Sequence, residues 1–233
     1  MNNQISVSII IPCFNEQSTI EKAVKNVREN GIDNKEIIII DDHSNDGTIE
    51  KLENLSEESD QKIIFNTKNH GKGYCLRKGF KEAKGEIILI HDADLEYDTK
   101  DHIKVLEPIF KDYADVVYGS RFISEGPTRL IYFWHKIGNF FLTNLCNLFL
   151  NLSMTDMETC LKAFKKKDIE KINLFEDRFG IEPEITIKLA KQKLRFYEVA
   201  IKYYGRTYKE GKKIKWYDGL YAVIAIIKYS IFS

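Results

Sequence analysis

The chain has 233 residues, a formal net charge of zero at pH 7, and 43% hydrophobic beside 30% charged residues. This composition is ordinary for a soluble globular protein and excludes wholesale disorder. The four cysteines are far apart and form no C-x-x-C pair, which argues against a disulfide framework or a structural zinc site and fits a reducing compartment. There is no signal-peptide pattern, and no run reaches the roughly 20 apolar residues that span a bilayer, so we expect a cytoplasmic protein.

Charge is distributed unevenly along the chain. Residues 1–120 carry a net charge of −8 and residues 121–233 a net charge of +8. An acidic half of this kind suits a metal ion, whereas the basic half suits anions such as phosphates or lipid headgroups. A chance partition of charges over solvated faces explains the same numbers, so the charge pattern alone does not decide.

The first 120 residues alternate between short apolar runs and helical stretches. The apolar runs are rich in Ile and Val and lack in/out alternation, which is typical of strands buried on both faces of a parallel sheet. They predict strands at 7–11, 36–40, 62–65, 86–90 and 115–118, and helices at about 17–29, 46–57, 72–83 and 100–111. This order indicates βαβ units with right-handed crossovers, and hence an α/β fold.

Polar residues follow the predicted strands, and such loops converge on one edge of an open α/β sheet, where ligands bind. The fourth strand is followed by Asp92-Ala93-Asp94, two carboxylates one residue apart. Mg²⁺ or Mn²⁺ is commonly held by one or two carboxylates plus a substrate's phosphates. An Asp at a strand end also caps helices, so the pair gains weight from the loops after the first, second and fifth strands: Pro12-Cys13-Phe14-Asn15-Glu16, Asp41-Asp42-His43-Ser44 and Gly119-Ser120-Arg121. Together they predict chemistry on a diphosphate-bearing substrate.

A glycine-rich turn, His70-Gly71-Lys72-Gly73, opens the third predicted helix. Backbone N–H groups and a lysine in this position suit a phosphate, although a plain turn explains the same residues. The turn matches neither the dinucleotide-binding nor the P-loop spacing, which argues against a Rossmann dehydrogenase and a P-loop NTPase.

Two later segments, 129–152 and 214–232, are rich in apolar and aromatic residues. In the first, a narrow polar stripe recurs at three- and four-residue spacing: Asn139, Thr143, Asn144, Asn147 and Asn151. This pattern predicts amphipathic helices. Their broad apolar faces belong either in the core or in a membrane interface, and the sequence leaves both interpretations open.

The motifs together resemble the inverting glycosyltransferases of family 2, and within them the dolichol- and polyprenyl-phosphate sugar synthases. The resemblance rests on the loops above and on Thr155-Asp156-Met157-Glu158-Thr159-Cys160-Leu161-Lys162 and Tyr204-Gly205-Arg206-Thr207-Tyr208 through Gly211-Lys212-Lys213. It covers residues 5 to about 220. It implies a glycosyltransferase A-type α/β fold: one domain over 1–233 with a mostly parallel central sheet, a nucleotide-binding half at 1–120 and an acceptor half at 121–233.

The resemblance also implies roles for individual residues. The nucleotide sugar would be held by Pro12, Phe14, Glu16, Ile40, Asp42, Lys72, Asp92 and Ala93. The metal, Mg²⁺ or Mn²⁺, would be ligated by Asp92, Asp94 and Glu96. Donor and acceptor phosphates would be neutralised by Arg121, Arg129, Arg206 and Lys212, since charge-assisted hydrogen bonds to phosphate are strong. By contrast, Asp41 and Asp46 are expected to form turns, and His43 and His91 to be structural.

The activity that the resemblance implies is transfer of a hexosyl group from a UDP- or GDP-linked sugar to a polyprenyl phosphate, such as undecaprenyl or dolichyl phosphate, with inversion. Asp94, Asp156 and Arg121 are the expected catalytic residues, and Asp156 would orient the acceptor, act as base, or only cap a following helix. The expected location is the cytoplasmic face of a membrane, bound peripherally, with no nucleic-acid partner. Three alternatives remain: a family 2 transferase that extends a glycan on a sugar hydroxyl, a nucleotidyltransferase, and a non-catalytic membrane-binding module.

Overall fold

The computed structural model describes residues 5–55, 61–123, 129–130, 132–207, 210–213 and 216–232. Within these ranges one mixed sheet has the order β3-β2-β1-β4-β6-β5-β7. Its strands are β1 (Val7–Cys13), β2 (Lys35–Asp41), β3 (Gln61–Phe65), β4 (Ile87–Ile90), β5 (Val116–Ser120), β6 (Lys162–Lys165) and β7 (Phe196–Ala200). Strand β6 runs antiparallel to β4 and β5, and the other pairs are parallel. The predicted α/β fold with a mostly parallel sheet is confirmed.

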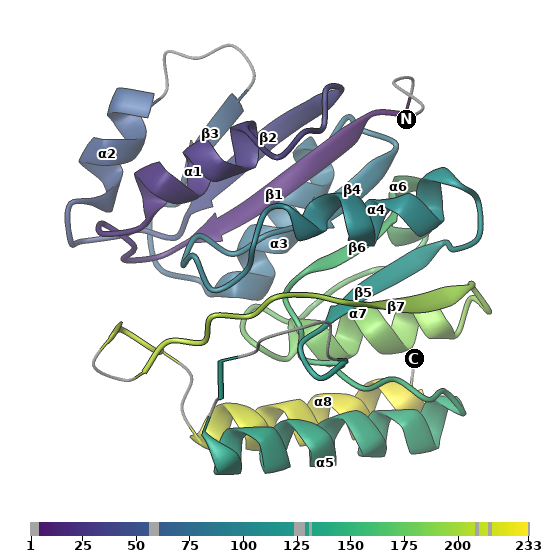
Figure 1. Ribbon diagram of the computed structural model, residues 1–233. Coiled ribbons are helices and arrows are strands. Elements are labelled where there is room, and N and C mark those ends of the chain that lie inside the picture. The colour runs from purple at the N-terminus through teal and green to yellow at the C-terminus, as the bar shows by residue number, and fades with distance from the viewer. Residues whose placement is uncertain are drawn as a thin grey trace.

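Helices cover both faces of the sheet (Figure 1). They are α1 (Ile20–Arg28), α2 (Thr48–Leu55), α3 (Lys72–Glu82), α4 (Asp101–Phe110), α5 (Phe133–Leu150), α6 (Lys166–Ile169), α7 (Ile181–Ala190) and α8 (Trp216–Phe232). Helices α1, α2 and α4 share one hydrophobic cluster with Ile9 and Ile11 of β1, whereas α3, α7, α5 and α8 share the other with Ile10. The continuous apolar run of β1 is thus explained by burial on both faces.

The five predicted strands and four predicted helices are present, with ends that differ by at most three residues. One expectation about them is wrong: β3 is not buried on both faces. It is the edge strand of the sheet, and its Phe65 is exposed. Strands β6 and β7 and helices α6 and α7 are not predicted from the sequence. Strand β6 has only four residues, with lysines at both ends.

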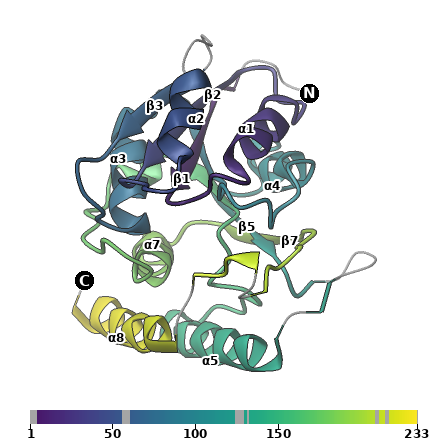
Figure 2. The same ribbon diagram turned by 90° about the vertical axis from the view of Figure 1, so that its left-hand side faces the viewer.

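Helices α5 and α8 lie side by side, at the greatest remove from α1 and α2 (Figures 1 and 2). Part of the polar stripe of α5 faces inward: Asn139 and Thr143 are buried, whereas Asn144 and Asn151 are exposed. Much of its apolar face is exposed, with Trp134 at 77% and Leu148 at 78%. We call the exposed apolar side chains of both helices the apolar platform; they include Phe133, Trp134, Phe140, Phe141, Leu148, Leu220, Tyr221, Ile224, Ile231 and Phe232. The structure therefore excludes the core interpretation for these residues.

Candidate active site

Loops from distant parts of the chain meet at the carboxyl edge of β1 and β4. The loop after β1 is held by Thr48, whose Oγ1 accepts a hydrogen bond from the backbone N–H of Glu16 at 2.9 Å. The loop after β4 is crossed by residues 202–207, where the N–H of Tyr204 donates to the carbonyl of Glu96 at 2.8 Å. Glu16 and Glu96, which are 80 residues apart in sequence, are thereby brought to one site.

The guanidinium of Arg206 lies between three carboxylates at this site. It donates to both oxygens of Glu16 at 3.0 and 3.2 Å, to Oδ2 of Asp94 at 3.0 Å, and to Oε1 of Glu96 at 3.2 Å. Burial and the neighbouring charges of Asp92 and Glu96 nevertheless raise the pKa of Asp94 to about 7. The acidic cluster therefore carries more negative charge than Arg206 alone neutralises.

The donor chemistry of this cluster fits Mg²⁺ or Mn²⁺, because both ions prefer carboxylate oxygens. In the described part of the chain, no three His, Cys, Asp or Glu side chains lie close enough together to ligate one ion. Arg206 bonds both Asp94 and Glu96, so the position of positive charge between them is already filled. A divalent cation that binds these two carboxylates has to compete with that guanidinium.

Asp92 does not share the contacts of Asp94. Its carboxylate lies 2.9 Å from Nζ of Lys72, the first residue of α3, and Lys72 also contacts Sγ of Cys160 at 2.7 Å. The side chain of Lys72 is largely buried, and it lies beside Asp92 at the start of the helix that the glycine-rich turn opens. Gly73 is required beside it, because a Cβ at this position would lie 2.2 Å from the carbonyl oxygen of Glu176.

The residues expected to hold the nucleotide differ in exposure and in the contacts they make within the chain. Pro12 and Phe14 are partly exposed at the end of β1. Both oxygens of Asp42 accept hydrogen bonds from the chain itself, from the N–H groups of residues 70 and 71 and from the Asn66 amide. Asp42 therefore shapes the glycine-rich turn, and a base N–H would have to share its oxygens.

Two of the nucleotide-site expectations need correction. Ile40 is fully buried in the hydrophobic core, where it packs beside Gly79 of α3. Ala93 is likewise buried, in the cluster on the opposite face of the sheet. The side chains of Ile40 and Ala93 therefore do not line the cleft, and only their backbone is in a position to contribute.

Arg121 and Asp156 form a bidentate ion pair behind this edge. Nε and Nη2 of Arg121 donate to the two carboxylate oxygens at 2.6 and 2.7 Å, and the Arg121 backbone N–H donates at 3.0 Å. The amide of Asn139 in α5 adds a hydrogen bond at 2.8 Å. Asp156 is fully buried, and no helix begins directly after it, so the helix-cap interpretation is wrong. Asp156 holds Arg121 in place.

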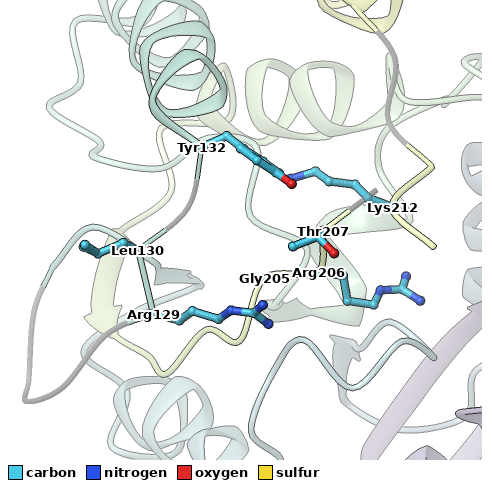
Figure 3. A pocket seen from close by; sticks show the side chains of 7 residues that line it. All are labelled: Arg129, Leu130, Tyr132, Gly205, Arg206, Thr207 and Lys212. Atoms are coloured by element: carbon cyan, nitrogen blue, oxygen red, sulfur yellow. The ribbon is translucent and has the colours of Figure 1, made fainter. Parts of the chain in front are cut away.

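A basic pocket of about 150 Å³ opens between the start of α5 and the segment that carries Arg206 (Figure 3). Its lining combines three cations with apolar and small residues: Arg129, Leu130, Tyr132, Gly205, Arg206, Thr207 and Lys212. Arg129 makes an exposed ion pair with Glu210 at 3.2 Å, and the ammonium of Lys212 lies over the ring of Tyr132. Three of the four predicted phosphate-binding residues thus surround one pocket, and Arg121 lies outside its lining.

Of the four residues predicted to form turns or to be structural, Asp41, Asp46 and His91 make such contacts, whereas the prediction for the exposed His43 stays untested. Asp41 accepts from the N–H and hydroxyl of Ser44, and Asp46 accepts from the N–H and hydroxyl of Thr48 at the start of α2, which are turn and cap contacts. His91 is buried beside His102, with 3.0 Å between ring nitrogens.

The sequence interpretation missed three contributors to this site. Lys213 donates to the carboxylate of Glu16 at 2.7 Å and to the carbonyls of the loop after β1. Lys162 and Glu182 form a buried ion pair beside Lys72. Lys213 stands in a basic stretch that was noticed, whereas no spacing rule links Lys162 of a strand to Glu182 of a helix 20 residues later.

Comparison with known proteins decides the family. Residues 8–172 match the family model described as glycosyl transferase family 2. The chain belongs to this family.

Membership of family 2 confirms the resemblance and makes the chain a glycosyltransferase. It is 31% identical to a UDP-N-acetylglucosamine–dolichyl-phosphate N-acetylglucosaminyltransferase of Methanococcus voltae, with 84% of each protein covered. It is also 31% identical to a dolichol-phosphate mannosyltransferase of Pyrococcus furiosus over 79% of the chain, and spans about half (53%) of that enzyme. Glucosyl-3-phosphoglycerate synthase from Mycobacterium tuberculosis, solved with Mn²⁺, UDP and phosphoglyceric acid, shares the fold (TM-score 0.73, 14% identity, covering 99% of this chain and 80% of that one).

Proposed function

We propose that this chain transfers a hexosyl group from a UDP- or GDP-linked sugar to a polyprenyl phosphate, with inversion at the anomeric carbon. One observation carries the proposal: the basic pocket opens at the start of α5, whose apolar face is exposed. A lipid phosphate has the matching chemistry, an anionic head on an apolar tail. The names of the relatives from Methanococcus voltae and Pyrococcus furiosus support the same acceptor class.

The donor binds, in this proposal, at the edge where Glu16, Asp94 and Glu96 meet. Asp94 and Glu96 would hold Mg²⁺ or Mn²⁺, with Asp92 beside them, and the ion would neutralise charge that develops on the leaving diphosphate. Arg206 would then exchange its carboxylate partners for phosphate oxygens. It is suited to this exchange because it already lines both the acidic cluster and the basic pocket.

The acceptor requires no strong protein base. A phosphate monoester has a second pKa of about 6 and is largely ionised at neutral pH. A sugar hydroxyl would need a base, and among the described residues that line the basic pocket there is no carboxylate. Asp156 is occupied by Arg121 and Asn139, so its role is to orient Arg121 rather than to remove a proton. This favours the lipid phosphate over extension of a glycan.

The apolar platform would bring the enzyme to its acceptor. Helices α5 and α8 lie side by side (Figure 1) and both carry exposed aromatic and aliphatic side chains. The basic pocket at the start of α5 would suit anionic headgroups, which attract cations. No helix among the described residues has the length and hydrophobicity to cross a bilayer. We therefore propose peripheral binding at the cytoplasmic face of a membrane, with residues 1–120 serving the nucleotide and residues 121–233 the acceptor.

A binding experiment tests the acceptor class. A short-chain polyprenyl phosphate and the matching alcohol are titrated in detergent against the wild type and against Lys212→Gln. We expect the phosphate to bind more tightly than the alcohol, and the difference to shrink in Lys212→Gln. Equal binding of alcohol and phosphate by the wild type would contradict a phosphate-reading pocket.

A further inference from the structure

A fully buried ion pair lies directly behind the donor edge. Lys162 of β6 has no exposed surface, and its ammonium bonds Oε2 of Glu182 in the first turn of α7. The same ammonium lies 4.8 Å from the centre of the Tyr118 ring, which packs over it. The phenol of Tyr118 is in turn fixed by Thr186 of α7 at 2.7 Å. The position of Glu182 is therefore determined from several sides.

The second oxygen of Glu182 points to the donor edge. Oε1 lies 3.2 Å from Nζ of Lys72, and Lys72 lies 2.9 Å from Asp92. The four side chains form a line of alternating charge, Lys162, Glu182, Lys72 and Asp92, that leads from the core to the loop after β4. Lys72 is the third member of this line, and it and Asp92 are the two members with exposed side-chain surface, 11% and 18%.

A contribution to folding stability is a weak explanation for the buried ion pair of Lys162 and Glu182. Taking two charges out of water costs several kcal/mol per ion, and replacing a buried pair with apolar residues of similar size is often neutral or stabilising. The neighbourhood offers apolar partners in abundance, since Phe164, Ile181 and Ile185 are all fully buried nearby in the same cluster. A buried charge that contacts a residue of the donor edge is better explained by what it does to that residue.

We propose that Glu182, fixed by Lys162, is a positioning residue that holds the ammonium of Lys72 for the donor's diphosphate or sugar. With Glu182 charged, Lys72 is shared between two carboxylates and stays at the start of α3. Without that charge, Asp92 is the remaining carboxylate partner of Lys72. The lysine then neutralises Asp92, which lies in the loop after β4. This inference rests on the proposed function, because it requires that Lys72 face a nucleotide sugar.

A double-mutant cycle tests the inference. The dissociation constants of the Mn²⁺ complexes of UDP and GDP are measured calorimetrically for wild type, Glu182→Gln, Lys72→Met and the double variant. We expect each single change to weaken the better nucleotide about tenfold, as for loss of one charge-assisted hydrogen bond. If Glu182 acts through Lys72, Glu182→Gln has no further effect in the Lys72→Met background.

Matched controls separate positioning from folding. Lys188→Gln removes a largely buried charge from the same helix, where it pairs with Glu184 and not with Glu182, and we expect it to leave nucleotide affinity unchanged. If Glu182→Gln alone does not fold, the cycle is run with Lys162→Met added to every variant, since this removes the unpaired buried ammonium. Circular dichroism and thermal unfolding establish that each variant is native.

The outcomes are distinct. Additive effects, or a Lys72→Met variant that binds as well as the wild type, would overturn the positioning role while leaving the donor site in place. A wild type that binds neither nucleotide with Mn²⁺ would overturn the proposed donor function itself.

Discussion

Arg206 and Asp94 form an ion pair of 3.0 Å in the middle of the donor edge. The arginine thus occupies the position of positive charge that a donor-bound cation would take. Arg206 also lines the basic pocket, while its guanidinium points away from Arg129 and Tyr132 (Figure 3), so this residue lies between the two regions to which we assign substrates. In the proposed function, exchange of Arg206 for a metal ion would link donor binding to the acceptor side.

The first prediction concerns this exchange. Arg206→Gln removes a cation that competes for Asp94 and Glu96, so we expect Mn²⁺ to bind about two- to fivefold more tightly in the absence of nucleotide, the range of a partly exposed ion pair. Electron paramagnetic resonance of free Mn²⁺ measures the affinity. Arg129→Gln is the control, since Arg129 pairs with Glu210 and not with the acidic cluster. Unchanged or weaker Mn²⁺ binding by Arg206→Gln would show that no competition exists.

The second prediction concerns Asp94. Asp94→Ala removes a carboxylate that we assign to the metal, and we expect transfer to fall by about a thousandfold or more, the scale for losing a preorganised electrostatic contact. Asp98→Ala, in the same loop, should retain activity, because Asp98 accepts from the N–H of Lys100 and pairs with the half-exposed Lys202, and not with the acidic cluster. Substantial transfer by Asp94→Ala in buffer treated with a chelator would exclude a metal role for this residue.

The third prediction distinguishes an orienting from a basic role of Asp156. Asp156→Asn weakens the bidentate grip on Arg121, so we expect slower transfer and a loss of about 1–3 kcal/mol in unfolding free energy. Because the acceptor phosphate needs no base, the acid limb of the pH–rate profile should keep its shape. Disappearance of that limb in Asp156→Asn would identify the residue as a general base instead.

The fourth prediction concerns the apolar platform. Trp134→Glu places a charge on its exposed surface, and we expect the variant to float less well with liposomes that contain anionic lipid while its thermal stability is little changed. Tyr113→Glu is the matched control, since Tyr113 is an exposed aromatic residue outside α5 and α8. Equal flotation of the two variants would argue against docking through this surface.

The fifth prediction follows from Glu158, whose pKa is raised to about 7 by burial and by the charge of Glu182. A carboxyl with a raised pKa in the folded state binds a proton that the unfolded chain releases near pH 4.5, so stability falls as pH rises between these values. Glu158→Gln removes this fall. We expect its melting temperature to gain on that of the wild type from pH 5 to pH 7.5. A constant difference across that range would show that Glu158 does not titrate there.

The sequence predicts the half of the fold in which local signals are strong. Val7–Cys13 and Lys35–Asp41 are runs of Ile that only a doubly covered strand explains, and the polar residues after them mark the binding edge by topology. Strand β6 could not be predicted, because its place in the sheet depends on pairing with β4 and β5, which are distant in sequence. From the sequence alone Lys162 is expected at the surface, since its buried partner Glu182 is known only from the structure.

The site divides in the same way. The types of residue in the sequence predicted the acidic cluster and the basic pocket. The role of each side chain, however, depends on its hydrogen-bond and ion-pair partners, which only the structure shows. Asp42 is bound by the backbone of the glycine-rich turn, and Ile40 is buried because helices cover both faces of the sheet at β2. Helix α5 shows the limit most clearly: the sequence shows its amphipathic pattern, yet only the contact of Asn139 with Asp156 reveals that Asn139 of the polar stripe faces the protein.

Analysis of the reaction product tests the central claim most directly. Purified enzyme is incubated with Mn²⁺, labelled UDP- and GDP-linked hexoses, and a short-chain polyprenyl phosphate or its alcohol. The account predicts label in an acid-labile lipid phosphodiester, formed only with the phosphate and with the anomeric configuration opposite to that of the donor. Transfer of label to a sugar hydroxyl of an added glycan, with none to the lipid phosphate, would contradict it.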